Sequence, residues 1–143
     1  MDKIEFLILR NFLHNEQFTR KVLPFIKAEY FEDTSQKVIF EEILNFVQKY
    51  NQLATKEILS IEVENRKDIN EDSFKQISNL IENLDDDPTE IDWLVNTTEK
   101  WCRDRAIYIA LMESIHIADG KDEKKNRDSI PSILSDALAV SFD

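Results

Sequence analysis

An uninterrupted helical pattern from Glu90 to Ala118 limits what this chain can fold into more than any other feature of its sequence. At ~3.6 residues per turn, the first half of the pattern has one apolar face and one polar face. The second half is apolar around its whole circumference and is interrupted only by Glu113, Ser114 and His116. Its apolar side chains are Ala106, Ile107, Tyr108, Ile109, Ala110, Leu111, Met112, Ile115, Ile117 and Ala118. A helix that is apolar on every side must be covered on every side, either by the rest of its own chain or by another chain.

The length of this helix indicates that another chain supplies part of the cover. At ~1.5 Å per residue the helix measures ~43 Å. A compact globule of this chain length has a radius of gyration of about 14–15 Å and a diameter of roughly 37 Å. We therefore expect part of the helix to project and to form an oligomer interface. The predicted interface residues are Ile107, Leu111, Met112, Ile115 and Ala118 on this helix, and Leu134 and Leu138 on the next. Ile107, Leu111 and Ala118 should matter most, because they lie on the side that is polar in the first half of the helix.

The composition of the chain favours helices and argues against nucleic acid as a direct ligand. The 143 residues include one glycine and three prolines, which leaves little of the turn chemistry that a sheet needs. The formal net charge of −11 repels phosphate backbones, so we expect no direct DNA binding. The single cysteine, Cys102, excludes an internal disulfide and suits the reducing cytoplasm, and its place on an apolar face predicts a core residue. No apolar run is long enough to span a membrane, and Met1-Asp2-Lys3 is unlike a secretion signal.

Helix signals along the chain predict an all-α fold, with a helical-bundle head over residues 1–88 and a long helical hairpin over residues 89–143. Four predicted helices are Ile4 to Leu13, Glu16 to Phe25, a helix that Asn70 or Ser73 opens and that runs to Leu84, and a helix from Ser129-Ile130-Pro131 to Val140. Three further helices follow a predicted capping residue: Asp33 before the helix to Tyr50, Thr55 before the helix to Val63, and Thr89 before the helix to Ala118. Gly120 follows the long helix where a left-handed residue is expected. Glu99 and Arg103, four residues apart, should form a surface ion pair.

The sequence lacks the motifs of several enzyme classes. Phosphate-binding loops of the types GxxxxGK[ST] and GxGxxG need at least two glycines, and the chain has one. Glu113 and His116 have the Glu-x-x-His spacing of di-iron bundles, but no second motif accompanies them, so a polar strip on a packed helix is the better interpretation. Asp85 to Thr89 resembles the start of a calcium loop, but Glu90 stands where the turn glycine belongs. We therefore predict no catalytic residue, no metal site and no cofactor in this chain.

A set of short motifs, in one order along the chain, resembles a known family. The motifs are Glu29-Tyr30-Phe31-Glu32, Trp93-Leu94-Val95, Thr98-Glu99-Lys100, Arg105-Ala106, Ile130-Pro131, Ala137-Leu138 and Ser141-Phe142-Asp143. In order and spacing they resemble the N-terminal region of the replicative DNA helicases of T-even-type bacteriophages, which belong to the DnaB-like helicase family. The resemblance extends over essentially the whole chain.

The resemblance implies a parent protein that is a hexameric, ring-shaped, ATP-dependent helicase unwinding DNA in the 5′-to-3′ direction in the cytoplasm of the bacterial host. An ATPase motor, which binds ATP and magnesium, would follow a linker after Asp143. In this family the N-terminal domain is a helical globule with a helical hairpin, hairpins of neighbouring subunits pair, and this layer contacts primase. A helicase loader is a further implied partner. This chain would then be the assembly and primase-docking domain, without the catalytic residues of the motor.

Two other interpretations stay open at this point. A free-standing acidic helical phage protein could bind a host or replication partner, with its charge imitating that of DNA; it would end at Asp143. A metal-dependent helical enzyme is the third interpretation, and metal analysis of the purified protein would test it.

Overall fold

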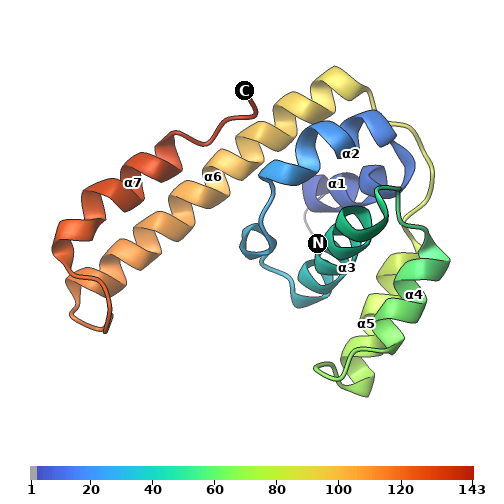
Figure 1. The fold of residues 1–143 in the computed structure, drawn as a ribbon, viewed down its shortest axis with the longest axis horizontal. Helices are drawn as coiled ribbons and strands as arrows, with labels where there is room; N and C mark the ends of the chain where they lie inside the picture. Colours follow the sequence, from blue (N-terminus) through green and yellow to red (C-terminus); the bar gives the residue numbers. More distant parts are fainter. Residues whose placement is uncertain (1–2) are drawn as a thin grey trace. The chain divides into compact units, whose positions relative to one another are not determined.

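The computed structural model describes residues 3–143, which form α-helices and short 3₁₀ turns without any strand (Figure 1). The α-helices are α1 (Lys3–His14), α2 (Glu16–Val22), α3 (Thr34–Tyr50), α4 (Lys56–Glu64), α5 (Glu71–Glu82), α6 (Ile91–Ala118) and α7 (Ile130–Leu138). The 3₁₀ turns are Leu23–Phe25, Ala28–Tyr30 and Arg127–Ser129. The predicted all-α fold class is confirmed. Within the described range, no helix is both long enough and apolar enough to cross a membrane.

The described chain divides into two compact units, which we call unit 1 (up to Val95) and unit 2 (Asn96–Asp143). The division falls inside α6, so the first turn of this helix belongs to unit 1 and the remainder to unit 2. The sequence places the boundary earlier, between residues 88 and 89, in the acidic loop before α6.

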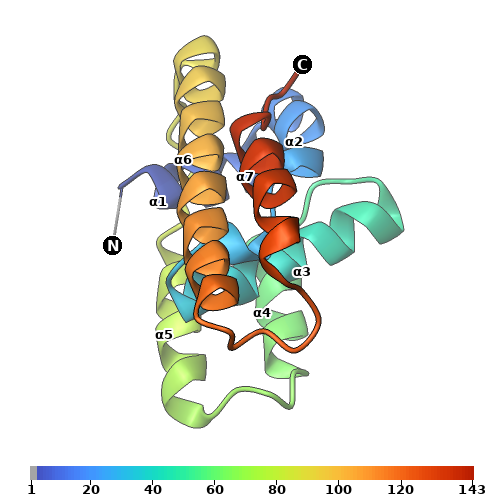
Figure 2. The ribbon, with the colours of Figure 1, turned by 90° about the vertical axis from the view of Figure 1, so that its left-hand side faces the viewer.

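The core of unit 1 is aromatic and lies among α1, α2 and α3. The helices α4 and α5 pack against α3 (Figures 1 and 2). Phe12, Phe18, Phe31 and Phe40 are fully buried. Ring centroids lie 5.3 Å apart for Phe12 and Phe18 and 5.3 Å apart for Phe31 and Phe40. These distances are typical of favourable aromatic pairs, whose large buried surfaces dominate the stability of small cores. The short connector after α2 brings Phe31 into this cluster.

The starts of α3, α4 and α5 are fixed by side-chain caps that the sequence predicts. Asp33 accepts a hydrogen bond from the backbone N–H of Gln36 (3.0 Å), and Thr55 accepts one from that of Ile58 (3.2 Å). Asn70 caps α5, which decides between the two predicted starts of that helix. Each cap satisfies a backbone donor that has no partner inside the helix.

The predicted cap of α6 is wrong by one residue. Thr89 does not cap the helix, because its hydroxyl oxygen accepts hydrogen bonds from Arg10 (3.0 Å) and Asn11 (3.1 Å) of α1. Glu90 takes the capping role, and its carboxylate accepts a hydrogen bond from the backbone N–H of Trp93 at 2.6 Å. A carboxylate at this position also interacts favourably with the positive end of the helix dipole.

Two large apolar side chains on the helices of unit 1 lie at its surface. Tyr50, in the last turn of α3, and Ile61, on α4, are each more than half exposed. The ring of Tyr50 packs against that of Phe46, with centroids 4.8 Å apart and an angle of 35° between the ring planes. Periodicity predicts the face of a helix, but how far along that face the neighbouring elements extend depends on the tertiary fold.

The loop between α4 and α5 is held by a single arginine. The guanidinium of Arg66 donates to Glu42 (2.7 Å) and Glu41 (3.2 Å) on α3 and to both carboxylate oxygens of Asp68 (2.9 and 2.7 Å). The Glu42 side chain is only 10% exposed. The hydrogen bonds to Asp68 are the main cause that raises the pKa of Arg66 above its ordinary value, so the group is charged at every accessible pH. The loop is therefore fastened to α3 by charge-assisted hydrogen bonds.

Unit 2 is a helical hairpin in which α7 runs back beside α6, as both views show (Figures 1 and 2). Gly120 ends α6 with φ 71°, a left-handed conformation that glycine adopts without strain. The backbone N–H of Lys121 donates to the carbonyl of His116 (3.1 Å), and that of Gly120 donates to the carbonyl of Ile117 (2.9 Å). These two bonds form a Schellman motif, as the position of Gly120 predicts.

Candidate assembly interface

The second half of α6 carries an exposed apolar strip, which we call the outer seam. It consists of Tyr108, Leu111, Met112 and Ile115, each 48–54% exposed. The spacing of these residues is i, i+3, i+4, i+7, so they line one face of the helix over two turns. Such spacing is typical of a helix that packs against another helix.

The opposite side of α6 faces α7. Glu99 and Arg103 on this side bind the segment that follows α7, and Ala110, Ser114 and Ile117, further along the same side, are buried. At 100° per residue this side lies well away from the outer seam. The outer seam therefore stays free for a second contact when the hairpin is closed.

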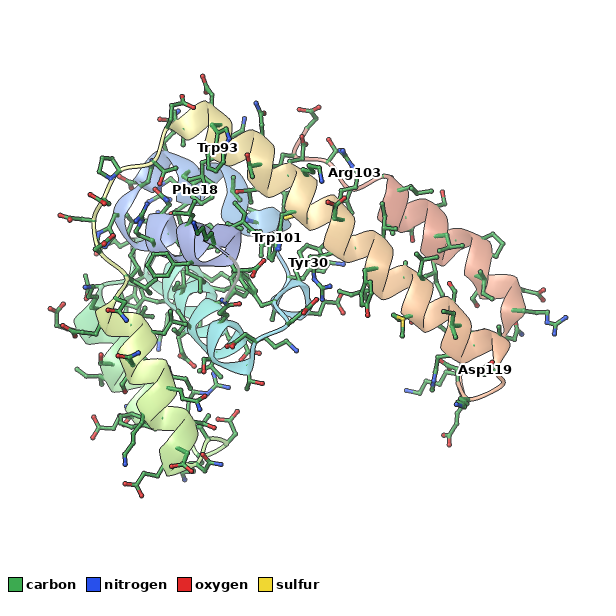
Figure 3. The ribbon with its side chains drawn as sticks, turned by 180° about the vertical axis from the view of Figure 1, so that it is seen from behind. Phe18, Tyr30, Trp93, Trp101, Arg103 and Asp119 are labelled. Carbon is green, nitrogen blue, oxygen red and sulfur yellow. The ribbon has the colours of Figure 1, made fainter. Side chains whose placement is uncertain are left out.

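The C-terminal segment is fastened to α6 by two side chains that do not pair with each other. The guanidinium of Arg103, a residue labelled in Figure 3, donates from Nε to the carbonyl oxygen of Val140 (3.1 Å). The Glu99 carboxylate accepts from the backbone N–H of Phe142 (2.7 Å) and, at 3.4 Å, from the hydroxyl of Ser141. The predicted surface pair between Glu99 and Arg103 is wrong, because backbone groups distant in sequence compete for both side chains.

We expect Glu99→Ala to loosen the end of the hairpin. The change removes a charge-assisted hydrogen bond to a backbone N–H in a half-buried site, worth about 1.5–3 kcal/mol locally. Amide hydrogen exchange should accelerate at Phe142 and stay unchanged at Phe12 in unit 1. Glu123→Ala, which removes an exposed acid from the turn of the same hairpin, is the control and should change neither. Equal protection of Phe142 in the Glu99 variant and the parent would contradict this role of Glu99.

The predicted interface residues divide into two groups in the structure. Five are exposed and two are intermediate between buried and exposed. The exposed residues are Leu111, Met112, Ile115, Ala118 and Leu138, and the intermediate ones are Ile107 and Leu134. Leu138 is the most exposed large apolar side chain in this unit, at 65%. The exposure makes these residues available to a second chain, and their part in an interface stays a prediction.

Tyr108 belongs to the outer seam but is missing from the predicted interface. A signal for it exists in the sequence, because Leu94, Trp101, Tyr108 and Ile115 follow one another at steps of seven residues. A seven-residue step returns to nearly the same side of a helix. Leu94 and Trp101 are buried, whereas Tyr108 and Ile115 are about half exposed. These four residues therefore form one stripe along α6 that is buried in the first half of the helix and about half exposed in the second.

Cys102 is a core residue, as predicted, and not a nucleophile. It is fully buried, and burial together with the negative charge of Glu99 raises the pKa of its thiol to about 12. The thiol is therefore protonated near neutral pH, and the thiolate that reacts with electrophiles is scarce. Across residues 3–143, no group of three or more His, Cys, Asp or Glu side chains is placed to hold a metal ion.

Comparison with known proteins gives one informative match. The chain is 32% identical, over 145 aligned positions, to the DnaB-like replicative helicase of Enterobacteria phage T4. The resemblance to a DnaB-like replicative helicase is confirmed. The match covers 96% of this chain and 30% of the length of the phage T4 protein. No family model matches the chain.

Proposed function

We propose that this chain is the N-terminal assembly and primase-docking domain of a hexameric, ATP-dependent replicative DNA helicase. The match of nearly the whole chain to about a third of a DnaB-like helicase supports this assignment. The outer seam carries the assembly part of the proposal, because four large apolar side chains on one helix face stay half exposed after the hairpin has closed. Exposed strips of this kind mark contacts with other proteins.

The chemistry of unwinding would belong to a motor outside this chain. ATP and magnesium binding by the usual route needs a glycine-rich loop whose backbone N–H groups surround the phosphates, and Gly120 is the sole glycine here. The present residues therefore do not fit a nucleotide site of that type. Their proposed contribution is to join subunits into the ring that works at the replication fork in the bacterial cytoplasm.

The charges at the two ends of the outer seam favour an antiparallel pairing of α6 helices. Arg105 lies just before the seam and Asp119 just after it, two heptads apart along the helix. In an antiparallel pair, Arg105 of one copy lies near Asp119 of the second copy. A parallel pair would instead bring two arginines together at one end and two aspartates at the other. The antiparallel arrangement also places Tyr108 opposite Ile115 of the second copy.

Cysteine cross-linking tests both the contact and its direction. Chains with Tyr108→Cys and isotope-labelled chains with Ile115→Cys are mixed and oxidised mildly, and the masses of the linked products are measured. We expect mixed 108–115 products to predominate. Cys102 gives no background because it is buried, and Tyr50→Cys, an equally exposed position in unit 1, is the control that should not link. Absence of any linked product would contradict the assembly role, and an excess of self-linked products would contradict the antiparallel direction.

The docking part of the proposal concerns primase, with a helicase loader as a second partner. Co-sedimentation of this chain with the primase of the same replication system tests it directly. We expect a complex that persists at low micromolar concentration. A primase that sediments alone under these conditions would contradict the docking role while leaving the assembly role intact.

A further inference from the structure

We draw no further inference here: the strongest candidate, the partly exposed apolar patch that Leu134 and Leu138 form on α7, carries nothing because nothing in the structure shows what covers it.

Discussion

Replacing Leu111 with aspartate is expected to weaken self-association of this chain by about two orders of magnitude, since a central apolar side chain of an interface contributes ~2–4 kcal/mol. Leu111 lies in the middle of the outer seam and is 48% exposed in the single chain. Because Leu111 lies outside the buried core, the substitution should leave the hairpin folded, while an aspartate at a paired seam would bury an unpaired charge. Sedimentation velocity over a range of protein concentrations measures the effect.

The control for this experiment is Ile61→Asp, which places the same charge at an exposed aliphatic position of a helix in unit 1. It should leave the oligomeric state unchanged. The pair Ile107→Ser with Leu111→Ser provides a milder second variant that adds no charge. Unchanged oligomers in both Leu111 variants, with normal helicity, would show that the seam is not the interface.

The caps and the helix order follow from the sequence because their causes are local. Asp33 and Thr55 each bond a backbone group three residues ahead, so residue type and spacing suffice to predict them. Gly120 is predictable for the same reason, because a left-handed residue is needed directly after the last turn. These features involve only neighbouring residues.

The errors occur where a residue distant in the chain competes for a side chain. Thr89 is a residue type that often caps a helix, but its hydroxyl oxygen accepts a hydrogen bond from Arg10, 79 positions away. Glu99 and Arg103 have the spacing of a surface pair, but backbone groups near the C-terminus bind both. Periodicity alone does not rank such long-range partners against local ones.

The candidate interface is predictable in outline, because an apolar circumference indicates that a helix needs cover from outside its own hairpin. Which residues belong to the interface depends on the side of α6 along which α7 lies. Once Glu99 and Arg103 are known to face the C-terminal segment, Ile107 falls between the covered side and the seam, and Tyr108 falls within the seam. The helix pattern in the sequence contains both residues, but it does not distinguish these two sides.

Replacing Arg66 with alanine is expected to destabilise unit 1 by about 3 kcal/mol, the loss typical of breaking a buried ion pair on one side. The Arg66 and Glu42 side chains are 18% and 10% exposed, so the variant leaves Glu42 as a nearly buried carboxylate without its cation. The loop between α4 and α5 also loses its link to α3. Urea unfolding followed by circular dichroism measures the change in free energy.

Two further variants show whether unit 1 loses stability in Arg66→Ala because Glu42 is left without its cation. Lys75→Ala, which removes one side of an exposed pair in the same unit, should cost less than about 0.5 kcal/mol. Arg66→Met combined with Glu42→Gln removes both charges and should recover more than half of the stability that Arg66→Ala loses, because no buried charge is then left unpaired. A double variant as unstable as Arg66→Ala would show that the loss comes from packing.

The pH dependence of the same variant provides a further test through Asp68. Hydrogen bonding to Arg66 is the main cause that lowers the pKa of Asp68 below its ordinary value. A carboxylate with a lowered folded-state pKa contributes stability that is complete above its unfolded pKa and is lost as the pH falls through the folded one. The stability difference between the parent and Arg66→Ala should therefore be constant near neutral pH and narrow below pH about 4. A difference that stays constant down to pH about 2 would mean that the Arg66 carboxylate contacts contribute nothing to the fold.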